Sequence, residues 1–341
     1  MRSPRLAYAV LAASVALTVA FALAACGTQA PAQWHADPAA GPSSGDIVAS
    51  ATPTAVATPT AVATPSASAK PSASPLPPRA PSKTFTVATR QLSFARGTRQ
   101  LPTTVWYPAT STMANSPTAG GRFPVVVFSH GLRGLPAYYQ QLTSRIAAAG
   151  FVVAAPAYPF TNANSTAFNA GDMVNQPADA SAVVTAVLKL NTTSGDRFFG
   201  RIDTTHVGAA GHSAGGFTTA GLLAGKRDTR IKAGIIIAGG PMGAFSGPRT
   251  PVLFVHGDAD PTVAYAVGHD AYAKLSWPKA FLTEVGQAHG EYLRPGAPGF
   301  DQMMKTMLDF FRWSLYSDAT AKSRLRADAV TSGVTRWEAK L

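Results

Sequence analysis

Apolar and polar positions divide the chain from residue 84 onward into strand-like and helix-like segments. Residues 84–90 and 101–107 alternate apolar and polar side chains, the pattern of antiparallel strands with one exposed face. Residues 123–128 are continuously apolar and rich in β-branched side chains, as in a strand buried on both faces of a sheet. Further strands of this buried kind are predicted at 151–155, 207–210, 231–238, 252–255 and 281–285.

Helix-like segments separate these strands. They are predicted at 135–149, where Gly150 ends the helix, and at 176–190, 217–224, 264–275 and 299–315. Strands that alternate with helices predict an α/β fold, a mostly parallel sheet of eight strands with right-handed crossovers and helices on both faces. In such sheets ligands bind beyond the carboxyl ends of the strands. Four polar residues follow strand ends and are expected to share one crevice: His130, Ser213, Asp260 and His289.

The first residues predict export. Residues 1–5 are basic, and residues 6–25 are almost wholly apolar, which together predict a signal peptide of residues 1–25. The following Cys26 is the only cysteine of the chain, and its place after Leu-Ala-Ala resembles the bacterial lipoprotein signal, in which the cysteine is lipidated and becomes the N-terminus. The resemblance implies a cell-surface protein anchored to the bacterial membrane through Cys26, or a secreted one. The alternative is an uncleaved transmembrane anchor, since about 20 apolar residues can span a bilayer.

Residues 26–83 differ in composition from the rest of the chain. They are rich in Ala, Pro, Ser and Thr and include two copies of Ala-Thr-Pro-Thr-Ala-Val between positions 51 and 62. With few bulky apolar residues they cannot bury a core, so a disordered tether is predicted ahead of one globular domain, residues 84–341. A single cysteine permits no intramolecular disulfide, and the exported fold must rely on its core. A hydrophobic content of 46 % is sufficient for that core.

The net charge first suggests a nucleic-acid partner. The formal charge is +12, and removal of Arg2 and Arg5 with the signal leaves 12 − 2 = +10. The basic residues are scattered, however, with no run of Lys and Arg interleaved with aromatic residues, so no nucleic acid is expected. The histidines lack metal-ligand spacing, so no metal or cofactor is expected either. The domain is expected to be a monomer.

The strongest chemical motif is Gly-His-Ser-Ala-Gly at residues 211–215. It lies between a predicted strand and a predicted helix, where the G-x-S-x-G pattern places a nucleophilic serine on a sharp turn and the glycines avoid a Cβ clash. The pattern alone is weak evidence, because residues 41–45 also fit it inside the tether. The surrounding strand and helix therefore single out Ser213 as the nucleophile.

A serine nucleophile needs a base, and the base needs an anion that fixes its tautomer. His289 follows the last predicted strand in a flexible loop and is the predicted base. The acid is expected between serine and histidine in the chain, where Asp258 and Asp260 follow a strand. Asp260 is preferred, since the turn at Gly257 carries the chain over the strand end and Asp258 is then placed to bond turn amides. The other histidines considered lie in a strand, the elbow or a helix: His206, His212, His256 and His269.

The tetrahedral intermediate of acyl transfer needs two amide donors for its oxyanion. The N–H of Ala214, directly after the nucleophile, is one predicted donor. The second is expected from the loop that follows the strand at 123–128, whose sequence is Ser-His-Gly-Leu, and Leu132 is its predicted residue.

These motifs, with the late His289, resemble the α/β-hydrolase superfamily over residues 84–320. Residues 175–179 and 201–203 resemble the bacterial dienelactone-hydrolase-like and platelet-activating-factor acetylhydrolase-like esterases. Two departures limit the comparison. Dienelactone hydrolases proper have a cysteine where this chain has Ser213, and bacterial cutinases and polyester hydrolases usually carry a disulfide that one cysteine forbids. The resemblance implies a serine hydrolase that cleaves carboxylic esters through an acyl-enzyme on Ser213.

Substrate selection is expected in two irregular segments. Residues 158–173 and 239–249 are interpreted as opposite rims of the pocket, with Phe160 and Phe168 in the first and Met242 and Phe245 in the second. Two alternatives to a small-ester hydrolase stay open: a hydrolase of polyester, cutin or lipid, and a non-catalytic surface-binding lipoprotein. The segment after residue 316 has no predicted function, although its tryptophan suggests that it packs back on the domain.

Overall fold

The computed structural model describes residues 79–225 and 227–341. The predicted signal peptide, Cys26 and the tether up to residue 78 lie outside the described residues. Ala80 packs against the core, and the carbonyl of Pro81 accepts a hydrogen bond from Arg312 Nη2 at 2.9 Å. The domain therefore gains contacts from residues that the sequence analysis assigns to the tether. None of the described helices has the length and apolar character needed to cross a bilayer.

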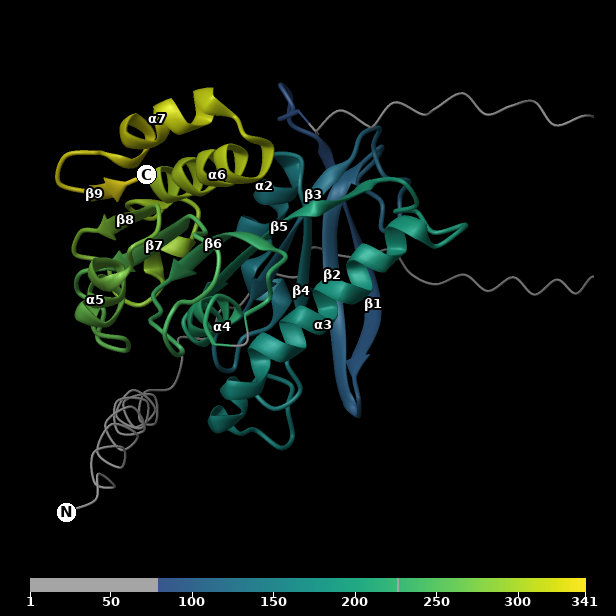
Figure 1. The fold of residues 1–341 in the computed structure, drawn as a ribbon, viewed down its shortest axis with the longest axis horizontal. Helices are drawn as coiled ribbons and strands as arrows, with labels where there is room; N and C mark the ends of the chain where they lie inside the picture. The colour runs from purple at the N-terminus through teal and green to yellow at the C-terminus, as the bar shows by residue number, and fades with distance from the viewer. Residues whose placement is uncertain (1–78, 226) are drawn as a thin grey trace, which may run out of the picture. The chain divides into compact units, whose positions relative to one another are not determined.

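One mixed sheet forms the centre of the described domain (Figure 1). Its strand order is β1-β2-β4-β3-β5-β6-β7-β8-β9. Neighbours from β4 to β8 pair in parallel, whereas β1 with β2, β2 with β4 and β8 with β9 pair antiparallel. The bounds are β1 Thr86–Arg96, β2 Arg99–Ala109, β3 Phe123–Ser129, β4 Val152–Pro156, β5 Ile202–His212, β6 Ile231–Ile237, β7 Val252–Gly257, β8 Lys279–Glu284 and β9 Thr335–Lys340.

The mostly parallel α/β sheet is confirmed, but the described part of the chain has nine strands where the sequence predicts eight. The ninth, β9, is an edge strand whose residues are largely polar and therefore carry no buried-strand pattern. Its Trp337 lies opposite Leu282 of β8 and packs against the core. The C-terminal segment thus covers the edge of β8, which agrees with the expectation drawn from its tryptophan.

Helices cover both faces of the sheet, and Figure 1 shows α3 passing in front of it. Core residues of α3, α4 and α5 pack on one face and those of α2, α6 and α7 on the other. Along β3, Val125 and Val127 face the first group while Val126 and Phe128 face the second. Two-sided burial explains the uninterrupted apolar strands. The helix bounds are α2 Gln140–Ala148, α3 Gln176–Lys189, α4 Ala214–Leu222, α5 Tyr265–Lys274, α6 Phe300–Tyr316 and α7 Ala319–Ala329.

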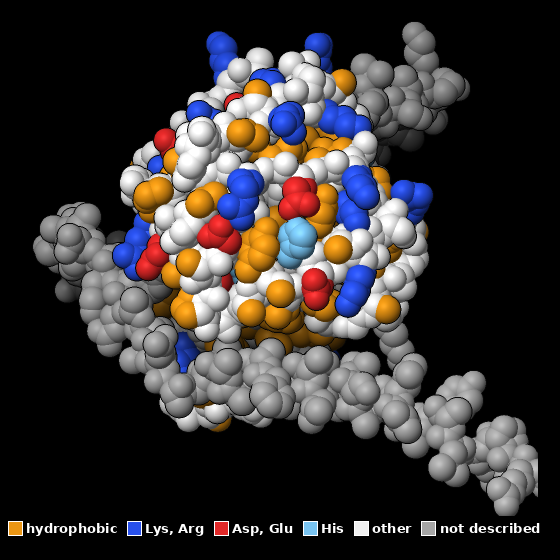
Figure 2. All heavy atoms as spheres, turned by 90° about the vertical axis from the view of Figure 1, so that its left-hand side faces the viewer, with side chains coloured by type: hydrophobic (Ala, Val, Ile, Leu, Met, Phe, Trp, Pro, Cys, Tyr) orange, Lys and Arg blue, Asp and Glu red, His pale blue; other side chains and the backbone are white. Residues whose placement is uncertain are grey.

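The surface carries no basic cluster on the face shown in Figure 2. Lys and Arg side chains are spread there among acidic, polar and apolar ones rather than gathered in one patch. Many of the described arginines are engaged in ion pairs, such as Arg90 with Asp196 and Arg230 with Asp228. On this face the charge pattern agrees with the scattered distribution seen in the sequence.

Candidate active site

The turn between β5 and α4 holds Ser213 in a sparsely populated backbone conformation. Its φ of 58° and ψ of −123° are unusual for a residue with a side chain. The N–H of Ser213 donates to the carbonyl of Ile237, at the end of β6, over 2.9 Å. The adjoining strand therefore fixes the turn from which the hydroxyl projects.

The two glycines of the motif are required by close backbone approach. A Cβ on Gly211 would collide with the carbonyl of Gly215, and a Cβ on Gly215 would collide with the carbonyl of Ser129 at the end of β3. The sequence predicts the glycines from the tightness of the turn. The structure adds that β3 presses against the same turn.

The structure brings together Ser213, His289 and Asp260. His289 Nε2 lies 2.8 Å from Ser213 Oγ, and His289 Nδ1 lies 2.7 Å from Asp260 Oδ2. These side chains come from the ends of β5, β8 and β7, which are neighbours or near neighbours at the carboxyl edge of the sheet. One imidazole thus bridges a hydroxyl and a carboxylate, the arrangement that a serine nucleophile needs.

Asp260 is held as an anion by its donors. Its Oδ1 accepts hydrogen bonds from the N–H groups of Thr262 and Val263 at 2.8 and 2.9 Å, and its Oδ2 lies 3.2 Å from His256 Nε2. Burial alone would raise the pKa of Asp260, but hydrogen bonds from His256 and His289 hold that pKa well below its ordinary value. His256 therefore contacts the same carboxylate oxygen as the base.

Asp258, the alternative acid, has different partners. Its Oδ1 accepts from the N–H of Gly286 at 2.6 Å, and its Oδ2 accepts from Arg336 of β9 at 2.9 Å. The carboxylate bonds a turn amide, as the sequence analysis expects, and is bound to the edge strand rather than to His289.

Glu284, the last residue of β8, is a second buried carboxyl group, which the sequence analysis did not single out. Neither of its oxygens finds a hydrogen-bond partner among the described residues, and burial raises its pKa to about 9. A carboxyl group with this pKa is protonated at neutral pH. Asp260 is therefore the anion that faces His289, and Glu284 is neutral.

We call the turn after β3, residues 130–134, the oxyanion turn, because it contains Leu132, whose amide the sequence predicts as an oxyanion donor. Gly131 packs so closely on the nucleophile that a Cβ there would lie 3.1 Å from Ser213 Cβ. The N–H of Gly131 donates to Tyr139 Oη at 3.1 Å and that of Arg133 to the carbonyl of Thr161 at 2.7 Å. Neither the N–H of Leu132 nor that of Ala214 has an acceptor within residues 79–225 and 227–341.

Other histidines within residues 79–341 that the structure describes have structural partners. His130, which the sequence places in the shared crevice, is buried with Nδ1 2.7 Å from the carbonyl of Gly131 and with Nε2 accepting from the N–H of Tyr158 at 3.1 Å. Burial lowers the pKa of His130 to about 4, so it holds the turn as a neutral ring. His206 pairs with Asp203 at 2.6 Å and His269 with Glu338 at 2.9 Å.

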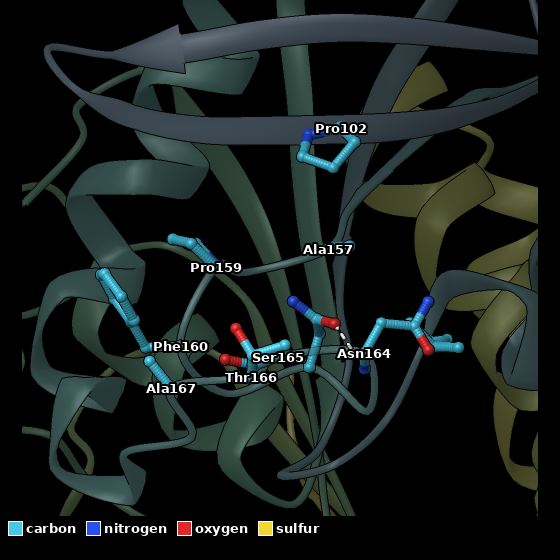
Figure 3. A pocket seen from close by; sticks show the side chains of 10 residues that line it. Pro102, Ala157, Pro159, Phe160, Asn164, Ser165, Thr166 and Ala167 are labelled. Carbon is cyan, nitrogen blue, oxygen red and sulfur yellow. Dashed lines mark hydrogen bonds between the residues drawn. The ribbon is translucent and has the colours of Figure 1, made fainter.

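A pocket of about 330 Å³ lies beside the oxyanion turn (Figure 3). Its walls are Pro102 of β2, Leu135 and residues between 157 and 167, and Figure 3 shows Pro102 across the hollow from Ser165. No charged side chain lines it. Phe160 of the first predicted rim lines this pocket, whereas Phe168 of the same rim lies under the guanidinium of Arg133, 3.9 Å from its ring centre. No residue of the second predicted rim lines this pocket.

An ion-pair network holds the pocket wall in place. Arg99 of β2 binds Asp172 at 2.6 Å and Asp179 at 2.7 Å, and its guanidinium lies 5.3 Å from the ring centre of Phe160. Hydrogen bonds to both carboxylates raise the pKa of Arg99 further above its ordinary value. These ion pairs therefore hold the loop after β4 and the start of α3 against β2.

A second connection joins this loop to the nucleophile helix. Gln176, at the start of α3, donates from Nε2 to Thr161 Oγ1 at 2.7 Å and accepts from the hydroxyl of Thr218 in α4. All of these side chains are buried. The pocket wall and the serine turn are thus connected through one buried amide.

Comparison with known proteins gives one family. A family model described as Chlorophyllase matches residues 86–250, just under half of the chain. This span includes Ser213 and the oxyanion turn, and it ends before Asp260 and His289. A search of the curated proteins found no significant match. The family match and the sheet topology support the α/β-hydrolase fold and indicate a hydrolase that acts on esters.

Proposed function

We propose that this α/β-hydrolase is a serine esterase that cleaves carboxylic esters through an acyl-enzyme on Ser213. The observation that carries the proposal is the position of His289, which lies 2.8 Å from the Ser213 hydroxyl and 2.7 Å from the Asp260 carboxylate. The buried Asp260 carboxylate beside His289 Nδ1 keeps a proton on that nitrogen, which leaves Nε2 free to accept the serine proton.

The proposed reaction follows from these atoms. Ser213 Oγ forms a bond to the ester carbonyl carbon while its proton passes to His289 Nε2. The tetrahedral intermediate then collapses, the bond to the leaving oxygen breaks, and the imidazolium returns the proton to the alcohol. Water, deprotonated by the same nitrogen, then attacks the acyl carbon; the bond to Ser213 Oγ breaks, the imidazolium returns the proton to Oγ, and the acid is released. Asp260 stabilises the imidazolium and is not itself protonated.

The amides of Leu132 and Ala214 are proposed as the oxyanion donors. Both N–H groups lack an acceptor among the described residues; Ala214 directly follows Ser213, and Leu132 directly follows Gly131, which packs against Ser213. The neighbouring N–H of Gly131 is already used by Tyr139. Preorganised donors of this kind stabilise the developing negative charge without reorganisation.

Labelling with a fluorophosphonate tests the proposal. An activated serine oxygen attacks the phosphorus of this reagent and displaces fluoride. We expect peptide mapping to find the resulting adduct on Ser213. Protein denatured before exposure serves as the control and should stay unlabelled. Failure of the folded protein to react would favour the non-catalytic surface-binding alternative.

We further propose that the pocket beside the oxyanion turn receives an uncharged part of the ester distant from the scissile bond. Leu135 lines the pocket three residues after Leu132, so its wall lies within about 11 Å of the oxyanion amide. Beside the apolar side chains, the lining includes Asn164, Ser165 and Thr166, whose side-chain polar groups have no hydrogen-bond partner in the described part of the chain. This lining suits a neutral group with both apolar surface and hydrogen-bonding oxygens.

Filling the pocket should discriminate between esters by size. Ala167→Trp is expected to lower kcat/KM about tenfold for esters with an extended uncharged acyl or alcohol part, since a few lost apolar contacts cost on the order of 1.4 kcal/mol. Hydrolysis of a short acetyl ester should be unchanged. Ala273→Trp, on the exposed side of α5, is the matched control. An equal loss on short and long esters would remove the pocket from substrate recognition.

A further inference from the structure

A line of three hydrogen bonds runs behind the catalytic side chains. The N–H of Gly131 lies 3.1 Å from Tyr139 Oη, Tyr139 Oη lies 2.9 Å from His212 Nδ1, and His212 Nε2 lies 2.6 Å from the backbone carbonyl of His289. Tyr139 and His212 are both buried. The line joins the oxyanion turn to the loop of the base through the residue that precedes Ser213.

Chemistry fixes the direction of every bond in this line. The carbonyl of His289 can only accept, so His212 Nε2 carries a proton. Burial and the nearby His289 lower the pKa of His212 to about 3, so its ring is neutral and Nδ1 can only accept. Tyr139, whose pKa burial raises to about 12, therefore donates to Nδ1, and its oxygen accepts from Gly131. Each of these polar groups has a partner.

The neighbouring glycines leave room for the line. A Cβ on Gly290, directly after the base, would lie 3.1 Å from His212 Nε2, and a Cβ on Gly131 would lie 3.3 Å from Tyr139 Oη. Both distances are tighter than ordinary van der Waals contact. Side chains at either position would push the ring of His212 or Tyr139 away from its partner.

We propose that His212 and Tyr139 are positioning residues for the reaction, an inference that rests on the proposed serine esterase function. Asp260 fixes the ring of His289, while His212 fixes the backbone that carries this ring. Tyr139 accepts the N–H of Gly131 and so holds the turn whose next amide, that of Leu132, is proposed for the oxyanion. Because His212 directly precedes Ser213 in the chain, this line of hydrogen bonds fixes the positions of both the base and the oxyanion turn relative to the nucleophile.

The test compares variants that remove the bonds with one that restores part of the line. Tyr139→Phe deletes the hydroxyl with little change in volume, and His212→Leu deletes both ring nitrogens. We expect kcat on a short soluble ester to fall about 10- to 100-fold with little change in KM, because misplacement by about 1 Å is enough for such losses. His212→Gln offers an amide N–H toward the His289 carbonyl and should recover part of kcat.

Two further measurements separate positioning from a purely structural role. Val187→Ala, in the core under α3, should lower the thermal midpoint but leave kcat unchanged at temperatures where the protein is folded. The rate of fluorophosphonate labelling should fall in Tyr139→Phe in parallel with kcat. The inference would be overturned if both Tyr139→Phe and His212→Leu were labelled at the same rate as the wild type and kept its kcat. It would also be overturned if the losses in kcat only followed the decrease in thermal midpoint. Absence of wild-type labelling would instead remove the proposed function on which the inference rests.

Discussion

Replacement of Ser213 by alanine is expected to lower kcat/KM for carboxylic esters by about 10⁵-fold. The variant loses the hydroxyl oxygen that lies 2.8 Å from His289 Nε2, and with it the covalent step. Removal of the nucleophile in serine hydrolases of known mechanism costs losses of this order, and the remaining rate reflects binding and oxyanion stabilisation. The measurement is steady-state hydrolysis of a short acyl ester.

The fold should survive this change. Alanine keeps the Cβ that the turn already accommodates, and the N–H that bonds Ile237 is unaffected. Circular dichroism and the thermal midpoint should therefore match those of the wild type. Ser144→Ala, a serine on α2 that bonds only its own helix, is the matched control and should retain full activity. Turnover retained by the Ser213 variant would exclude this residue as the nucleophile.

Asp260→Asn should give the second largest effect, a fall of about 10⁴-fold in kcat. An amide in place of the carboxylate can hold the imidazole in the wrong tautomer and cannot stabilise the imidazolium. Asp258→Asn is the matched variant, since its carboxylate bonds Gly286 and Arg336 and does not touch the base. It should keep activity within about threefold of the wild type and lose only a small amount of stability from an exposed ion pair.

The pH dependence of stability gives an independent check on Asp260. Because its folded pKa is depressed, its charge stabilises the folded state above the unfolded carboxyl pKa of about 3.9, and this contribution is lost as pH falls toward the lower folded value. The difference in thermal midpoint between wild type and Asp260→Asn should therefore become smaller as the pH is lowered from 6 to 3.

In the activity measurements, equal losses of kcat in Asp260→Asn and Asp258→Asn would contradict the assignment of Asp260 as the acid.

The pattern of apolar and polar residues along the chain was sufficient to predict most strands and helices of the fold. Continuous β-branched runs and the helix-like segments between them predict the parallel strands and their helices, because burial on both faces leaves no polar residue in β3 before Ser129 or in β7 before His256. The helix α3 was predicted within one residue of its observed end. The edge strand β9 and helix α7 were missed, since polar residues on an edge carry no such pattern.

Residues of the site divide in the same way. Ser213, Asp260 and His289 could be proposed from their order and their places after strands, and the choice of Asp260 over Asp258 agrees with the hydrogen bonds observed. His130 was expected in the crevice and proves to be buried behind the turn. Tyr139 carried no signal, because its role depends on a contact with a residue that is 73 positions away in the chain.

The sequence by itself determined the α/β class, the strand–turn–helix around Ser213 and the supply of an acid and a base at strand ends, since each of these depends on neighbours within a few residues. Only the tertiary structure decided which groups touch. Gly215 against Ser129, Arg99 against Phe160 and His212 against the carbonyl of His289 join segments far apart in the chain. Such contacts depend on how strands are ordered and packed, which short-range periodicity does not specify.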